Sequence, residues 1–434
     1  MKSIWFDTVS LPAFPILKED LKTDVLIIGG GMAGLLCAWH LQKAGVDYAL
    51  IEADTICSGV TGCTTAKITS QHGLIHEKLL RRFGTEKARM YYEANENARK
   101  RFRDLCSKMD CDFQETDAYV YAQDDFRKLD RELAALEKIG APAEFVETLP
   151  IPVETVGGIR FPQQAQFHPL KFVAEMAKDL RIYEHTRALS YEGKNSVRTD
   201  RGTVRADRIL VATHFPMFNK HGSYFLKLYQ HRSYVVALGN GPNVGGMYVD
   251  ESKNGLSFRN YGDYLLLGGG SHRTGKQGGN WQELMSFAQK HYPKANVRYQ
   301  WATQDCLSLD DVPYIGPYSR NMSNVMVASG FNKWGMTGAM TAAAILTDQI
   351  LNQDNEFASV FSPSRSMIHP QLFCNAAEAT VNLLTPTKPR CPHMGCALKW
   401  NPQEHSWDCP CHGSRFAEDG KLLDNPANGS LKRQ

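Results

Sequence analysis

The segment that decides the fold is residues 25–52, which read VLIIGGGMAGLLCAWHLQKAGVDYALIE. The pattern predicts an apolar strand, a glycine turn, a helix and a second apolar strand that ends in an acid. Gly29, Gly31 and Gly34 fill the G-x-G-x-x-G positions that permit a tight turn, close approach to a pyrophosphate and helix–strand packing. Glu52 stands at the position where, in this motif, an acidic residue accepts hydrogen bonds from a ribose 2′-OH. A parallel-sheet turn with chance glycines is the alternative, but the combination predicts a dinucleotide site.

Length and composition indicate a globular protein of two or three domains. The chain has 434 residues, of which 43% are hydrophobic and 22% are charged. The net charge of +3 is close to balance and no lysine-arginine block stands out, so we expect no nucleic-acid binding. Residues 1–15 contain no continuous apolar run, and we expect neither a secretory signal nor a membrane span. Most of the 11 cysteines are scattered, which favours reduced thiols and a cytoplasmic protein.

Two further stretches have the composition of a cofactor site. Residues 56–69 read ICSGVTGCTTAKIT and are rich in glycine and hydroxyl groups that can donate hydrogen bonds to a polar cofactor. A plain surface loop is the alternative interpretation. Residues 330–338 read GFNKWGMTG and form a second glycine turn. A helix is predicted over 339–351, directly after this turn. The positive end of its dipole, at the N-terminus, would face any group that binds there.

Five anchors, in order, resemble the FAD-dependent oxidoreductases of the D-amino-acid, glycine and sarcosine oxidase type over roughly residues 20–360. The anchors are the glycine turn with its acid, the hydroxyl-rich run 58–69, the strand 206–213, the run DDVPYIGP at 310–317 and the turn 330–338. The resemblance implies that FAD is held along its length by a defined set of residues. They are Gly29, Gly31, Gly34 and Glu52 at the ADP half, Leu189 near adenine, Ala212 and Thr213 after the strand, Thr61, Thr64, Thr65, Ala66 and Lys67 along the ribityl chain and flavin, and Gly330, Trp334, Gly335, Met336, Thr337 and Gly338 at the pyrimidine end.

The resemblance also implies an α/β fold with two intertwined domains. A glutathione-reductase-like Rossmann domain would bind FAD, and an antiparallel-sheet substrate domain would be inserted into it. We assign residues 1–75, 150–215 and 306–360 to the FAD-binding domain, 76–149 and 216–305 to the substrate domain, 361–385 to a linker, and 386–434 to a small all-β segment.

The family chemistry implied by the resemblance is oxidation of a C–N bond by hydride transfer to flavin N5. A helix N-terminus at the pyrimidine end would stabilise the negative charge that builds there. Arg259, on a predicted strand, is the candidate catalytic residue over the flavin, and a solvated strand charge is the alternative. Cys306 lies near the region where some relatives attach the flavin covalently, but the match there is loose.

The C-terminus carries a compact group of cysteines and histidines. Residues 391–396 read CPHMGC and residues 409–414 read CPCHGS, which gives a C-x-H loop and a C-x-x-H loop. Two thiolates and two imidazoles can hold a [2Fe–2S] cluster, and a structural zinc site accepts the same ligands. The doubled loops resemble Rieske proteins. That resemblance implies four cluster ligands, Cys391, His393, Cys409 and His412.

The Rieske resemblance is to the subclass with two additional cysteines. It implies a disulfide between Cys396 and Cys411, which is unusual in a reducing compartment. Phe416 stands where high-potential members carry a tyrosine that donates to a ligand sulfur, so we expect a lower potential. A Rieske domain has several strands before its first ligand loop, and only residues 385–390 precede it here. Either those strands are missing, as we expect, or the cluster loops lean on the flavin domain.

These inferences predict a FAD-dependent oxidoreductase that oxidises a small amine or amino-acid-like substrate and passes electrons to a Rieske cluster. The terminal electron acceptor is not specified by any motif. A one-electron outlet favours a dehydrogenase over an oxidase. The alternative is an electron-transfer protein in which FAD and the cluster relay electrons between partners without a small organic substrate.

Overall fold

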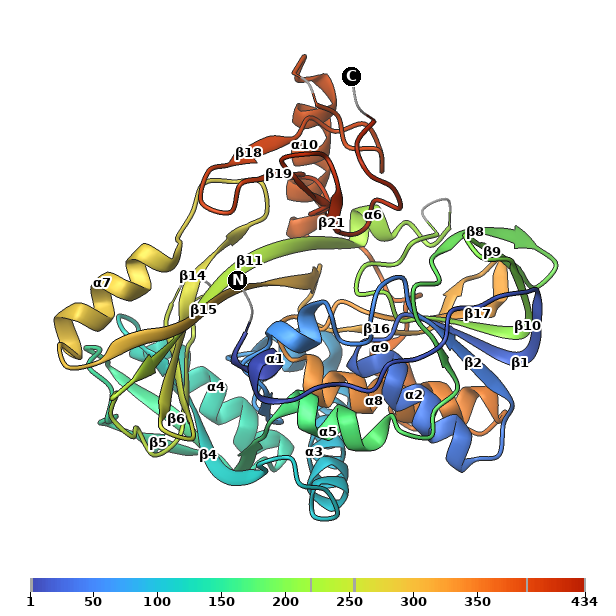
Figure 1. Ribbon diagram of the computed structural model, residues 1–434. Helices are drawn as coiled ribbons and strands as arrows, with labels where there is room; N and C mark the ends of the chain where they lie inside the picture. Colours follow the sequence, from blue (N-terminus) through green and yellow to red (C-terminus); the bar gives the residue numbers. More distant parts are fainter. Residues whose placement is uncertain (1–2, 219–220, 253–254, 388, 433–434) are drawn as a thin grey trace.

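The computed structural model describes residues 3–218, 221–252, 255–387 and 389–432. Two large sheets lie beside each other, and a small C-terminal sheet sits above the second one (Figure 1). Among the described helices, none is both long and apolar enough to cross a membrane. The helices are α1 (Ile4–Thr8), α2 (Met32–Lys43), the 3₁₀ helix η1 (Val60–Cys63), α3 (His76–Cys106), α4 (Phe126–Ile139), α5 (Pro169–Met176), α6 (Tyr224–Lys227), α7 (Trp281–His291), α8 (Gly335–Ile350), α9 (Ala358–Phe361) and α10 (Pro370–Leu384).

The first sheet is the Rossmann sheet that residues 25–52 predict. Its strands run in the order β16-β17-β10-β1-β2-β7, with β1 parallel to both β2 and β10. The last four residues of β1 are all buried, because helices α2 and α8 pack together over the sheet. The strands are β1 (Leu21–Ile28), β2 (Tyr48–Ile51), β7 (Ile182–Tyr183), β8 (Ala188–Gly193), β9 (Ser196–Thr199), β10 (Thr203–Val211), β16 (Tyr314–Ser319) and β17 (Met322–Ser329).

The second sheet has nine strands and is mostly antiparallel, as predicted for residues 230–305. Its order is β15-β11-β14-β13-β12-β4-β6-β3, and β12 pairs with β4 in the parallel direction. Helices α4 and α7 pack against this sheet. The strands are β3 (Lys67–Ile68), β4 (Gln114–Ala122), β5 (Glu144–Val146), β6 (Gly157–Gln166), β11 (Leu228–Gly239), β12 (Met247–Asp250), β13 (Ser257–Tyr261), β14 (Tyr264–Arg273) and β15 (Asn296–Ser308).

Two strands of the second sheet come from segments that we assigned to the FAD-binding domain. Strand β3 lies in the segment 1–75 and β6 in the segment 150–215, yet β6 pairs with β3 and with β4 in the second sheet. These pairings join strands far apart in the chain, so local pattern does not reveal them. Helix α3 is kinked at Gly84, which has a φ of 82°. Helix α10 occupies most of the predicted linker.

The C-terminal segment is a short four-stranded sheet that rests on the second large sheet. Its strands β18 (Lys399–Asn401), β19 (Ser406–Asp408), β20 (Arg415–Ala417) and β21 (Leu422–Asp424) have three residues each. In the described part of residues 385–390 there is only one isolated bridge, from Arg390 to Ala397. Gln230 and Gln304 of the large sheet donate to the main-chain oxygens of His412 and Gly413 (2.7 and 2.8 Å). The cluster loops therefore rest on β11 and β15 of the second large sheet.

A buried group of ion pairs ties this segment to β11. Arg232 donates through Nε to a Glu404 oxygen at 3.0 Å, and Glu404 also accepts from Arg415 at 2.9 Å. Arg415 in turn pairs with Asp408 and Asp424, each at 3.0 Å. The two arginines and Glu404 expose less than a tenth of their side chains, so each charge depends on its partners for the solvation that water would otherwise give.

We predict that Glu404→Gln loosens the C-terminal segment. Removing one partner from a buried ion pair costs about 3–5 kcal/mol, because the other charges stay buried. Denaturant unfolding should show a drop of that order, with faster proteolysis of the segment. Glu175→Gln is the matched control, since Glu175 pairs with Lys178 at 2.7 Å on the surface, where such a pair is worth about 0–1 kcal/mol. Equal effects of the two substitutions would contradict the tether.

Candidate functional site

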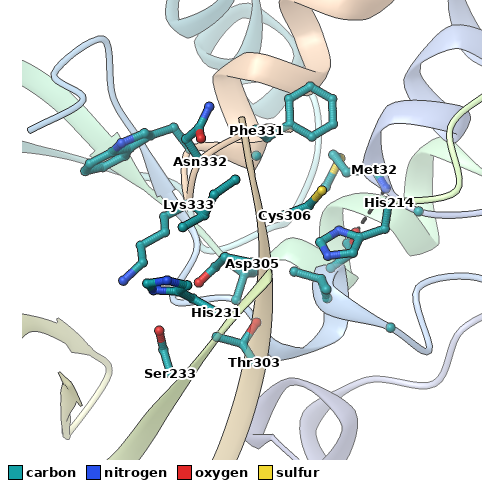
Figure 2. Close-up of a pocket in the computed structure, with 18 of the residues that line it drawn as sticks. Met32, His214, His231, Ser233, Thr303, Asp305, Cys306, Phe331, Asn332 and Lys333 are labelled. Carbon is teal, nitrogen blue, oxygen red and sulfur yellow. Dashed lines mark hydrogen bonds between the residues drawn. The ribbon is translucent and has the colours of Figure 1, made fainter. Parts of the chain in front are cut away.

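One large cavity of about 810 Å³ lies between the two large sheets. Its walls come from the first glycine turn, the segment 57–78, strands β11, β14 and β15, and the start of α8. Residues 421–428 of the C-terminal segment also contribute to the lining. Figure 2 shows the part of the cavity where β11, β15 and the second glycine turn meet.

The first glycine turn and Glu52 form one end of the cavity. Gly29, Gly31 and Glu52 line it, whereas Gly34 packs behind them. A Cβ at Gly34 would lie 1.9 Å from the carbonyl oxygen of Gly29, so only glycine permits this helix–strand contact. Glu52 accepts from the backbone N–H groups of Gly30 (2.6 Å) and Asp54 (3.0 Å), and burial raises the pKa of its carboxyl above the ordinary value.

Of the five residues predicted from the hydroxyl-rich run, four line the cavity and Ala66 does not. Thr61, Thr64, Thr65 and Lys67 line it, and Thr61 accepts from the N–H of Met32 at the start of α2 (3.0 Å). Lys67 donates to Thr65 at 3.2 Å. Burial, with smaller contributions from other cations, lowers the pKa of Lys67 to about 7. The site therefore contains a lysine whose charge is poised near neutral pH.

Arg259, the candidate catalytic residue, is not among the residues that line the cavity. Its side chain is buried behind the wall and donates to the carbonyls of Thr65 (2.7 Å) and Ala66 (2.8 Å). The guanidinium lies 5.6 Å from the ring of Trp5, and burial lowers its pKa to about 9. Ala66 adopts a φ of 53°, and Arg259 holds that turn in place. We assign Arg259 a positioning role.

The second glycine turn brings the N-terminus of α8 to the cavity. Trp334, Gly335 and Met336 line the cavity, and His72 stacks on Trp334 with ring centroids 4.9 Å apart. Thr337 faces inward and donates to the carbonyl of Thr69 at 3.0 Å. Two glycines act by packing instead of lining the cavity. Gly330 has a φ of 75°, and a Cβ at Gly338 would lie 2.8 Å from the ring of Phe331.

The remaining predicted cofactor residues fall on the first sheet. Ala212 and Thr213, at the end of β10, line the cavity. Leu189 does not line it, although the preceding residues Arg187 and Ala188 do. The carbonyl of Leu189 accepts from Asn428 at 3.5 Å, so this strand end also meets the C-terminal segment.

Sequence reasoning missed a polar patch on the β11/β15 ladder. His231 pairs with Asp305 and Ser233 pairs with Thr303, and all four residues line the cavity. Figure 2 shows their side chains close to Lys333. Alternation of side chains along the strand sequence 228–239 indicates which residues share a face, but it does not say which face meets the cavity.

The predicted cluster ligands meet in the C-terminal segment. The rings of His393 and His412 have centroids 4.9 Å apart, and Cys391 and Cys409 are buried in the same cluster. His412 donates through Nε2 to the carbonyl of Phe225 (3.0 Å), which leaves its Nδ1 without a partner in the described part of the chain. Both ring nitrogens of His393 are likewise buried and unpartnered among those residues. Unpartnered buried imidazole nitrogens beside thiols suit a metal cluster.

The two cysteines of the implied disulfide lie close together. The sulfur atoms of Cys396, Cys409 and Cys411 all lie within 4.8 Å of one another. This separation is short enough for oxidation to join Cys396 and Cys411. Phe416 is fully buried against these cysteines and offers no donor to them.

Comparison with known families decides the identity of both parts. The family described as FAD dependent oxidoreductase matches residues 24–349, and the Rieske [2Fe-2S] domain matches residues 381–433. The chain belongs to the FAD dependent oxidoreductase family. It therefore binds FAD in its large domain and carries a Rieske domain that binds a [2Fe–2S] cluster. The glycine contacts at the dinucleotide end and the unpartnered histidine nitrogens fit these two groups.

Two curated relatives extend this assignment. A Bacillus subtilis (strain 168) protein named YhfW, described as a Rieske 2Fe-2S iron-sulfur protein, is 34% identical over 496 positions. That alignment covers 100% of this chain and 97% of the relative. It has more positions than the chain's 434 residues, so the relative has internal residues without counterparts here. The gamma-glutamylputrescine oxidoreductase of Escherichia coli (strain K12) is 26% identical over 217 residues, or 46% of this chain and 50% of that protein.

Solved structures agree on the fold. Glycine oxidase from Geobacillus kaustophilus superposes with a TM-score of 0.67 at 18% identity, over 80% of this chain and 100% of that one. L-Proline dehydrogenase from P. horikoshii gives a TM-score of 0.65 at 16% identity, over 80% of this chain and 98% of that one. At these identities the likeness shows the fold alone.

We predict that Gly34→Ala abolishes FAD retention. The new Cβ would collide with the Gly29 carbonyl at 1.9 Å and push α2 off the strand that positions the pyrophosphate site. FAD per purified chain should fall to near zero, with a lowered melting temperature. Gly429→Ala is the control, because no heavy atom lies within 4 Å of its Cβ position. Full FAD content in Gly34→Ala would refute the packing role.

We predict that Cys409→Ser removes the cluster. The thiol lies buried among the other cluster cysteines, and a serine hydroxyl is a far poorer ligand for iron. Iron and acid-labile sulfide should both be lost, while FAD content stays unchanged. Cys374→Ser on α10 is the matched control, since that thiol is exposed and distant in sequence from the ligand loops. Retention of iron by Cys409→Ser would exclude this ligand.

Proposed function

We propose that the protein oxidises a C–N bond of a small amine or amino-acid-like compound and delivers the electrons to its own Rieske cluster. FAD, when bound, supplies hydride acceptance and release of single electrons. A one-electron outlet favours a dehydrogenase. The protein's own residues position FAD, separate the two cofactor sites and exclude water from the reacting centre.

The observation that carries this proposal is the closeness of the two sites. Thr213 and His214 line the FAD cavity, and the next residue, Phe215, lies against both cluster histidines. The Phe215 ring centroid is 6.2 Å from that of His393 and 6.1 Å from that of His412. The residue that lines the cavity and the residue that contacts the cluster histidines are therefore neighbours in the chain.

A hydrogen-bonded chain runs parallel to this contact. His214 donates through Nε2 to Gln230 Oε1 (3.2 Å), and Gln230 donates through Nε2 to the His412 carbonyl (2.7 Å). Burial lowers the pKa of His214, so it stays neutral and keeps a fixed donor. These contacts hold the cluster loop at a constant place beside the cavity. A fixed short separation supports electron transfer within one chain.

The side chains around the cavity also support a small substrate. Phe331 and Trp334 give an apolar wall, and Lys67 provides an amino group that can hold or release a proton near neutral pH. The N-terminus of α8 meets the cavity at Gly335 and Met336, and its dipole would stabilise negative charge on a group bound there. We also propose a reducing compartment such as the cytoplasm, because the cysteines outside the two cluster loops are scattered along the chain.

The decisive experiment mixes the purified holoprotein anaerobically with a panel of amines and amino acids. We expect one member to bleach the flavin and to produce the electron paramagnetic resonance signal of a reduced Rieske cluster. In Cys409→Ser the flavin should still bleach, but a one-electron acceptor should receive electrons much more slowly. The alternative of a relay without an organic substrate predicts bleaching by NAD(P)H or a partner protein only, and that result would displace the proposal.

A further inference from the structure

Part of the cavity wall lies outside residues 24–349, the part of the chain that matches the FAD dependent oxidoreductase family. It belongs to the iron–sulfur segment, where most of residues 421–428 line the cavity. We call residues 421–428 the strap. Because a flavin domain of this family has its own complete set of cavity walls from the matched region, an added wall from another domain calls for a function of its own.

Asn428 fastens the strap to the end of the cavity where the sequence predicts the ADP half of FAD. Its side-chain amide donates to the carbonyl of Leu189 at 3.5 Å, and the preceding residue, Ala188, lines the cavity. Thr186 also lines the cavity, and its backbone N–H donates to the carbonyl of Glu52 at 2.8 Å. The strap therefore reaches the wall beside the acid that we expect to hold the ribose.

Asn425 fastens the strap to a second part of the same wall. Its side-chain amide donates to the carbonyl of Thr213 and, at 3.3 Å, to that of Phe215. Thr213 lines the cavity just after β10, whereas Leu189 lies in β8. The strap is thus bound to the Rossmann domain at two separate places.

Other contacts fix the strap to the iron–sulfur segment itself. The backbone N–H of Ala427 donates to Ser414 Oγ at 3.0 Å, and Asp424 pairs with Arg415 at 3.0 Å. None of these contacts uses an atom of a predicted cluster ligand. The strap should therefore keep its place when the cluster is absent.

The strap also brings positive charge to the cavity. Its acid, Asp424, is already paired with Arg415, whereas the exposed Lys421 lines the cavity. The pyrophosphate of FAD is an anion, and a lysine ammonium acts on such a group as a point charge. Charge of this sign beside the ADP half favours the bound cofactor.

We infer that the strap is part of the FAD site and covers the ADP half of the cofactor. Asn425 and Asn428 are positioning residues that hold the strap on the wall, and Lys421 contributes charge to the binding of the pyrophosphate. The iron–sulfur segment thus retains the flavin mechanically as well as accepting its electrons. This role is independent of which substrate the flavin oxidises.

The test measures how often the pyrophosphate becomes accessible. A phosphodiesterase that hydrolyses FAD to FMN and AMP is added to the holoprotein, and the appearance of FMN is followed by fluorescence. Asn425→Asp removes both amide donors and places a carboxylate against two carbonyls. We expect it to raise the cleavage rate at least about tenfold, which corresponds to about 1.4 kcal/mol.

Two further variants address the other contacts of the strap. Asn428→Ala should also raise the rate, but less, because it removes one long hydrogen bond to the wall. Lys421→Ala should raise it as well, and its difference from the unaltered protein should shrink as ionic strength increases. Lys399→Ala is the matched control, since Lys399 is an exposed lysine of the same small sheet that does not line the cavity.

The Cys409→Ser variant separates the strap from the cluster. It should lose iron and still protect its FAD, because the contacts of the strap do not involve the cluster ligands. Iron content and circular dichroism of the strap variants report whether the segment stays folded. The inference is overturned if neither Asn425→Asp nor Asn428→Ala speeds cleavage. It is equally overturned if Lys399→Ala or Cys409→Ser speeds cleavage as much as they do, since general loosening would then be the cause.

Discussion

The structure depends on the pairing of β11 with β15, because this one ladder is the wall between two redox sites. Consecutive residues of a strand point to opposite faces, so a single hydrogen-bonded register positions both sets of side chains. His231 and Asp305 face the FAD cavity, while Arg232 and Gln304 hold the C-terminal segment. A slip of one residue would exchange the two sets and destroy both sites.

The same wall explains how so small an iron–sulfur segment is ordered. Four strands of three residues bury little apolar surface and are marginal as an independent sheet. Here the segment uses the outer face of β11 as its base and compensates its buried charges through Arg232 and Arg415. Docking on the second large sheet supports a segment that has no strand in residues 385–387 and 389–390, before its first ligand loop.

The sequence predicted the features that local chemistry dictates. The turn at residues 29–34 needs glycine where its strand and helix meet, and the C-x-H and C-x-x-H loops contain their own ligands. Both features could therefore be predicted without knowing which segments pack beside them. The places of Asp305 and Arg259 could not, because they depend on which strand lies beside each residue and which face meets the cavity. The place of β6 in the second sheet was hidden for the same reason.

The central claim is that electrons pass from FAD to the cluster within one chain, across the Thr213–Phe215 contact. Its most direct test is rapid-freeze electron paramagnetic resonance after anaerobic mixing of the holoprotein with a reducing amine, at several protein concentrations. The account predicts that the cluster becomes reduced after the flavin, with a first-order rate constant that is independent of protein concentration. A cluster that stays oxidised beside a bleached flavin, or a rate that rises in proportion to protein concentration, would contradict it.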